Sequence, residues 1–79
     1  LSQREAVLTE VLLRAGLNTP MPRTTLLLKV WGPDNDIEDG NLDNYIHFLR
    51  RRIRQLESTL QIKTLRGTGY CLTKADERN

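Results

Sequence analysis

The sequence has a single cysteine, a single histidine and four aromatic residues, and each scarcity removes a class of function. Cys71 has no partner for an internal disulfide, so a reducing compartment, the cytoplasm, is the expected location. A metal site needs several histidine or cysteine ligands, and His47 has none beside it, so neither a metal nor another cofactor is expected. His47, the only histidine, should lie on a different surface from Cys71, so we expect an inert thiol and no enzyme.

Long apolar runs are also missing. No stretch approaches the roughly 18 apolar residues that a membrane span requires, and no charged-then-apolar leader is present, so neither a span nor a signal peptide is expected. A domain of 79 residues buries about 60% of its unfolded surface, which leaves no room for a deep enzyme cleft. Because the chain starts at Leu1 without a methionine, we expect it to be a fragment of a longer protein.

Charge is distributed unevenly, although the formal net charge is only +2. Residues 34–43 contain five acidic residues and no basic one. Residues 44–74 contain seven basic residues and a single acidic one, Glu57. An acidic segment followed by a basic segment indicates two surfaces with different partners.

Two helices are predicted in the first half of the chain. Ser2 and Glu5 have the spacing of a capping box, so the first helix should begin near residue 3, and Gly16 is a typical stop. Pro22 excludes helix until about residue 23, where a short second helix should begin and run to Gly32. The apolar residues that recur at helical spacing are Val7, Leu8, Val11, Leu12 and Ala15, then Leu26, Leu27, Val30 and Trp31.

A third, longer helix is predicted from about Asn41 to Leu56, with Asp39 or Asn41 as its cap. Its apolar residues follow at steps of 4, 3, 4 and 3, which places them within a narrow arc at about 100° per residue. This arc should form the core face and fix the rotation of the helix about its axis. The five residues are Leu42, Ile46, Leu49, Ile53 and Leu56.

After Ser58 the apolar pattern changes to a period of two, which is typical of strands. The glycine-containing segment 66–69 separates two such runs and predicts a β-hairpin turn. The expected fold is therefore α+β, with three helices followed by a C-terminal hairpin. It should form a single domain over residues 1–74, with a polar tail at 75–79.

The third helix carries four arginines within positions 50–54, on the sides that the apolar stripe leaves open. The major groove of B-DNA is about 12 Å wide and admits one helix. The N-terminal half of the helix's outer face is therefore predicted to meet base edges, and the flanks of the helix are predicted to meet phosphates. Arg66 at the hairpin turn would suit the narrow, strongly negative minor groove. The base-facing residues would be Asn44, His47, Phe48 and Arg51, beside Asn41 near the helix start, and the flanking residues Tyr45, Arg50 and Arg52.

Simpler interpretations exist for the same features. Taken alone, an arginine run is more often a solvated helix face, and Trp31 is first of all a core aromatic. Residues 67–69 lack the third glycine and the following helix of a nucleotide-binding loop. An exposed Phe48 would suit the groove of another protein, so a protein–protein interaction module with this same fold is the alternative function.

Three stretches, in this order and spacing, carry a family resemblance: VWG at 30–32, LDNYIHFLRRRI at 42–53 and IKTLRGTGY at 62–70. Together they resemble the winged helix-turn-helix effector domain of OmpR/PhoB-type bacterial response regulators, from Leu1 to about Thr73. The resemblance implies the transcription factor of a two-component phosphorelay. In such proteins a separate N-terminal receiver domain is phosphorylated on aspartate and drives tandem binding, as a homodimer, to repeated promoter sites.

The resemblance also implies roles for individual residues. The helix from about Asn41 would be the recognition helix, and Thr64 and Arg66 would be wing contacts to the DNA backbone and minor groove. Residues 31–39 look like the loop that touches RNA polymerase, and this loop coincides with the acidic segment. Its candidate contacts are Trp31, Gly32, Asp34, Asp36, Glu38 and Asp39.

The chain departs from the family pattern in three ways. Family members commonly have basic residues where His47 and Phe48 stand, so phosphate pairing is weakened there, and Phe48 would instead suit a thymine methyl group. Pro22 replaces the serine usual before the second helix, which removes a side-chain cap. The small N-terminal sheet and the receiver domain of the family are absent from this sequence.

Overall fold

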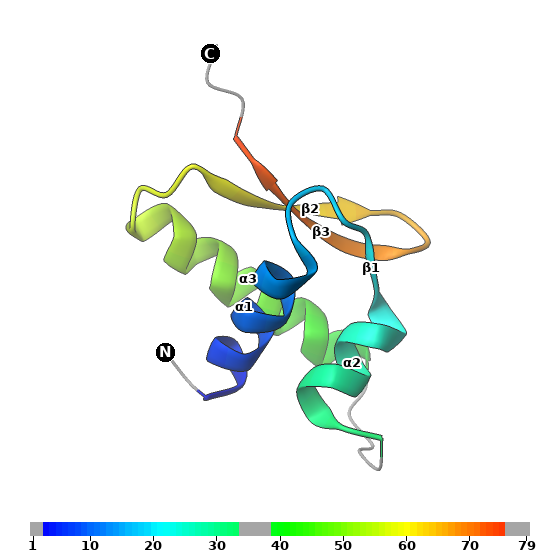
Figure 1. Ribbon diagram of the computed structural model, residues 1–79. Coiled ribbons are helices and arrows are strands. Elements are labelled where there is room, and N and C mark those ends of the chain that lie inside the picture. Colours follow the sequence, from blue (N-terminus) through cyan, green and yellow to red (C-terminus); the bar gives the residue numbers. More distant parts are fainter. Residues whose placement is uncertain (1–2, 34–38, 76–79) are drawn as a thin grey trace.

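The computed structural model describes residues 3–33 and 39–75 of the chain. These residues form three helices and a three-stranded sheet (Figure 1). The predicted helices and hairpin are all present, so the α+β winged-helix fold is confirmed. The elements are α1 (Gln3–Ala15), β1 (Met21–Pro22), α2 (Arg23–Trp31), α3 (Asp39–Gln55), β2 (Leu60–Leu65) and β3 (Gly69–Lys74).

The three helices and the hairpin share one apolar core. The predicted stripe of α3 faces inward, and Leu42, Ile46 and Leu49 are each at most 4% exposed. Leu8 and Leu12 of α1 are equally buried and belong to the same cluster. This burial fixes the rotation of α3, so that its opposite face is turned to solvent. The other buried members of the cluster are Met21, Leu26, Val30, Trp31, Ile62, Tyr70 and Leu72.

The sheet has the strand order β1-β3-β2, and both pairings are antiparallel. The sequence did not predict β1, because this strand has only two residues, one of them Pro22, and two residues show no periodicity. Met21 pairs with Tyr70, and Pro22 pairs with Gly69. A Cβ atom on Gly69 would lie 2.1 Å from the Met21 carbonyl oxygen, so only glycine fits where these two strands meet.

The prediction that Leu56 completes the buried stripe is wrong, because its side chain is 71% exposed. The helix ends at Gln55, and Glu57 adopts a left-handed conformation with φ of 53°. The next amide, that of Ser58, donates to the Ile53 carbonyl at 3.2 Å. Such a left-handed turn closes the helix and redirects the chain toward β2, which leaves Leu56 outside the core.

Two further expectations are adjusted. α3 begins at Asp39 instead of near Asn41. β3 does not alternate, because Tyr70, Cys71 and Leu72 are all buried in the central strand of the sheet. The expected capping residue Ser2, the loop positions 34–38 and the tail from residue 76 lie outside the described residues.

Candidate nucleic-acid interface

The outward face of α3 carries the side chains that were predicted to meet base edges. Asn44, His47 and Arg51 are exposed, and Phe48 keeps 49% of its surface exposed. At about 100° per residue these positions fall opposite the buried stripe. Asn41, one turn before Asn44, is exposed as well. The helix therefore presents one continuous outer face that the core does not use.

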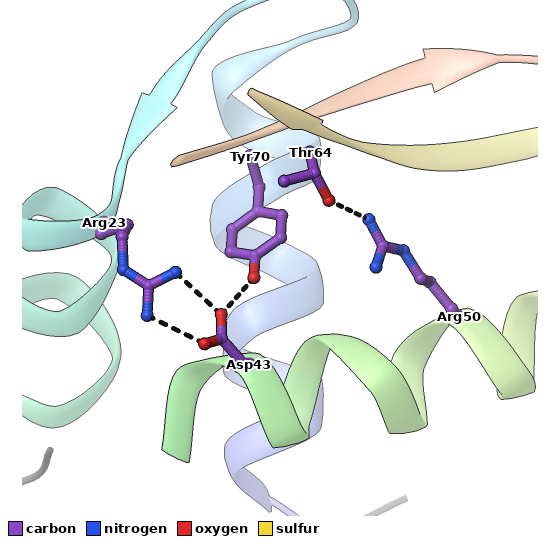
Figure 2. Close-up of polar contacts among 5 residues, drawn as sticks. All are labelled: Arg23, Asp43, Arg50, Thr64 and Tyr70. Atoms are coloured by element: carbon purple, nitrogen blue, oxygen red, sulfur yellow. Dashed lines mark hydrogen bonds and ion pairs between the residues drawn. The ribbon is translucent and has the colours of Figure 1, made fainter. Parts of the chain in front are cut away.

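One flank of α3 is tied to the hairpin. Arg50 donates from Nε and Nη2 to the Ile62 carbonyl at 3.1 and 2.7 Å, and from Nη2 to the Thr64 hydroxyl at 2.8 Å. Figure 2 shows the Arg50 side chain reaching from α3 to Thr64 on the strand beside it. Both residues were predicted as DNA contacts, and their hydrogen bonds also hold the hairpin against α3.

The other flank of α3 faces α2. Tyr45 is half-buried, and its ring meets that of Trp31 edge-on, with 5.3 Å between the centroids. Trp31 is 9% exposed, as expected of a core aromatic, and the Arg4 guanidinium lies 5.7 Å from its ring centroid. Arg52 is partly buried on the same flank. Tyr45 therefore has a packing role in addition to the phosphate contact predicted for it.

A carboxylate near the start of α3 joins three elements, and no pattern in the sequence predicted this. Asp43 accepts hydrogen bonds from Arg23 at 2.8 and 3.2 Å, in a bidentate ion pair, and another from the Tyr70 hydroxyl (Figure 2). The Arg23 and Arg50 guanidinium carbons lie 5.9 and 5.7 Å from the Tyr70 ring centroid. We name Arg23, Asp43, Arg50 and Tyr70 the clamp, because they connect α2, α3 and β3.

The clamp shifts the protonation of its members. The hydrogen bonds from Arg23, and then that from Tyr70, hold the pKa of Asp43 below its ordinary value. The same ion pair raises the pKa of Arg23 above its already high value. Burial, followed by the hydrogen bond to Asp43, raises the pKa of Tyr70 above its usual range. At neutral pH the clamp therefore contains an ionised carboxylate and a neutral phenol.

The hairpin turn is also joined to the start of α2. Pro22 occupies the N-cap position without a side-chain hydrogen bond, as its replacement of serine implies. The first amide of the helix, that of Arg23, donates instead to the Thr68 carbonyl of the turn at 3.0 Å. Arg66 is exposed in this turn, next to Gly67 with φ of 76°. The start of α2 thus holds the turn through the Thr68 carbonyl, while the Arg66 side chain remains exposed to solvent.

The acidic loop is described only at its edges. Gly32 closes α2 with φ of 94°, and its amide donates to the Leu28 carbonyl at 2.8 Å. Asp34, Asp36 and Glu38 lie outside the described residues, and the side chain of Asp39 is not described. The predicted polymerase contacts therefore stay a prediction.

Other kinds of site have no counterpart in the part of the chain that the structure describes. Among residues 3–33 and 39–75, no three His, Cys, Asp or Glu side chains are grouped as metal ligands. No helix within the same ranges is long and apolar enough to cross a membrane. Cys71 is buried in β3, as expected of an inert thiol.

Comparison with known protein families gives a match over most of the chain. The family described as "Transcriptional regulatory protein, C terminal" matches residues 1–72. Transcriptional regulatory protein DltR of Streptococcus agalactiae is 39% identical over 72 residues, which are 91% of this chain and 32% of DltR. Transcriptional regulatory protein YxdJ of Bacillus subtilis is 40% identical over 72 residues, 91% of this chain and 31% of YxdJ. The chain thus spans about a third of the length of these curated relatives.

Solved structures share the fold. The DNA-binding domain of Bacillus subtilis CssR superposes with a TM-score of 0.79 at 30% identity, over 92% of this chain and 77% of that one. The DNA-binding domain of the response regulator AdeR, crystallised in complex with an intercistronic region, gives the same TM-score at 18% identity, over 94% and 75% of the two chains. At that identity the AdeR likeness concerns the fold alone.

Proposed function

The chain belongs to the family of C-terminal domains of transcriptional regulatory proteins, the effector domains of OmpR/PhoB-type response regulators, and from this premise we propose how it binds promoter DNA. The outer face of α3 enters the major groove, and the hairpin turn reaches the adjacent minor groove. The family is one of regulators and not of enzymes, which confirms the expectation that the chain is no enzyme.

The observation that carries this proposal is that α3 buries one face and exposes the opposite one. Leu42, Ile46 and Leu49 are buried, while Asn44 and Arg51 are exposed on the opposite side. An amide can read adenine through two hydrogen bonds, and a guanidinium can read guanine or pair with phosphate. A rigid helix that is anchored on one side and carries such groups on the other suits a groove about 12 Å wide.

The hairpin supplies the second part of the proposed interface. It is fixed to α3 through Arg50, and its turn supports the first amide of α2 through Thr68. Arg66 is exposed in that turn and suits the narrow minor groove of an A·T-rich flank. Thr64 is exposed on β2 and can donate its hydroxyl hydrogen to a phosphate while it accepts the bond from Arg50.

The full-length protein would place this domain after a receiver domain. Curated relatives are about three times as long as the matched segment, which leaves room for a receiver. Phosphorylation of that receiver in a two-component phosphorelay would favour a homodimer on tandem promoter sites, in the bacterial cytoplasm.

The acidic loop would provide the contact with RNA polymerase. It lies between α2 and α3 and directly precedes the helix proposed to enter the groove. Reversing the charge of Asp36 and Glu38 should leave DNA affinity nearly intact and lower transcription in a reconstituted assay. Unchanged transcription would remove the polymerase assignment without affecting the DNA proposal.

A salt titration tests the DNA proposal. Duplexes selected from a random pool should bind with an affinity that falls steeply with salt, by a log–log slope of about −0.9 for each phosphate neutralised. Absence of duplex binding, or a flat response, would contradict it. In that case the half-exposed Phe48 would favour the alternative, a module that binds another protein through this ring.

A further inference from the structure

The half of α3 that would enter the groove first differs chemically from the half that follows. All four arginines of the helix lie between positions 50 and 54. Before them, the exposed outer face carries Asn41, Asn44, His47 and Phe48, none of which has a fixed charge. The leading half of the helix therefore lacks the long cations that pair with phosphates or with guanine.

Phe48 is the apolar member of this face. Its ring is 49% exposed and contacts the His47 ring edge-on, with centroids 5.6 Å apart and an interplanar angle of 61°. It also lines a shallow surface depression with Glu5, Arg51 and Arg52. A phenyl ring has no donor for a phosphate oxygen, so Phe48 can contribute to DNA binding only through an apolar group of the duplex.

The major groove contains one apolar group that meets this requirement, the 5-methyl group of thymine. Asn44 lies one helical turn before Phe48, about 6 Å along the axis, and base pairs are stacked about 3.4 Å apart. The two side chains can therefore reach base pairs that lie about one or two steps apart. Asparagine reads adenine through N6 and N7, which makes an A·T-rich step the natural partner of the pair.

We infer that Phe48 is a specificity-determining residue that packs its ring against the 5-methyl group of a thymine in the DNA half-site, beside an A·T pair read by Asn44. This inference rests on the proposed DNA binding. The His47 ring, which contacts the Phe48 ring edge-on, lies next to the same proposed contact.

Replacing single thymines with deoxyuridine tests this contact, because the exchange removes the methyl group and leaves base pairing intact. The half-site is first obtained by selecting duplexes from a random pool. Wild type should then bind one of the deoxyuridine-substituted duplexes about fourfold more weakly than the unsubstituted duplex. This is the factor expected for the loss of one buried methyl group. Phe48→Ala should bind the unsubstituted duplex more weakly and show no further loss on the substituted one.

Leu28→Ala provides the matched control, because Leu28 is 52% exposed on α2, outside the proposed interface. It should retain both the affinity and the fourfold deoxyuridine effect, and circular dichroism would verify that both variants are folded. The inference is overturned if wild type binds every substituted duplex as tightly as the parent, or if Phe48→Ala keeps the full effect. If wild type still binds duplex DNA in a salt-dependent way in either case, the proposed function stands. If wild type binds no duplex at all, both the proposed function and this inference are contradicted.

Discussion

Asp43 of α3 accepts a hydrogen bond from the hydroxyl group of Tyr70, a residue 27 positions later in the central strand β3. Arg23, at the start of α2, binds the same carboxylate through two nitrogens. One side chain thus connects α2, α3 and the hairpin strand β3 (Figure 2). The separation of the major-groove and minor-groove contacts in the proposed complex depends on this relation.

Removing the charge of Asp43 should weaken the clamp. Asp43→Asn retains the size of the side chain but loses the ion pair with Arg23, so the free energy of unfolding should fall by about 1 kcal/mol in urea titrations. Glu10→Gln is the matched control, because Glu10 forms an exposed ion pair with Arg14 at 3.2 Å within α1. It should change the free energy by less than about 0.5 kcal/mol. Equal losses in the two variants would contradict a special role for Asp43.

The contribution of Asp43 should depend on pH in a defined direction. Its pKa is lowered in the folded state, first by Arg23 and then by Tyr70, so its stabilisation is fully present above the ordinary value near 3.9. That stabilisation is lost as the pH falls through the lowered folded value. The stability difference between wild type and Asp43→Asn should therefore be constant from about pH 7 to 5 and shrink below about pH 4. A difference that persists unchanged at pH 2 would be inconsistent with this linkage.

Gly69 should tolerate no side chain, in contrast to Gly67 two residues before it. A Cβ atom on Gly69 would lie 2.1 Å from the Met21 carbonyl oxygen and 2.8 Å from the Arg23 amide nitrogen. Gly69→Ala should therefore separate β1 from β3 and cost about 3 kcal/mol or more of unfolding free energy. At Gly67 no atom lies within 4 Å of such a Cβ, and Gly67→Ala should cost about 1 kcal/mol, through its φ of 76° alone. Urea unfolding of the two variants would reveal the contrast, and similar losses would argue against close strand contact.

Arg50 and Arg51 are adjacent and should behave differently. Arg51 is exposed on the outer face, so Arg51→Ala should weaken duplex binding by about 1 to 3 kcal/mol and change stability by less than about 0.5 kcal/mol. Arg50 binds the Ile62 carbonyl and Thr64, so Arg50→Ala should also lower stability, by about 1 to 2 kcal/mol. Binding isotherms and urea titrations on both variants give the comparison. Wild-type affinity in Arg51→Ala would exclude this residue from the interface.

The periodic elements could be predicted from the sequence because their signals are local. The stripe of α3 needs a core partner on one side only, and its burial at Leu42, Ile46 and Leu49 followed directly from the spacing. The family resemblance, which combined this helix with the wing motif, is also confirmed. Local spacing failed at Leu56, because the left-handed turn at Glu57 ends the helix before the stripe is complete.

The contacts that were missed depend on tertiary structure. Asp43 is 20 residues from Arg23 and 27 from Tyr70, and in the sequence it looked like one more member of an acidic run. Arg50 had a predicted position on the helix, but a carbonyl partner at Ile62 carries no signature in the side-chain pattern. β1 gained its strand conformation only by pairing with β3. Each of these features is produced by a long-range contact.

The central claim is that one continuous surface, the outer face of α3 together with the hairpin turn, contacts DNA. The most direct test is an NMR titration of the isotopically labelled chain with a selected duplex. The largest shift changes are predicted at Asn44, His47, Phe48 and Arg51, and at the turn residues from Arg66 to Thr68. Changes confined to the outer side of α1, around Ala6, Glu10 and Leu13, with no response from α3, would contradict the account.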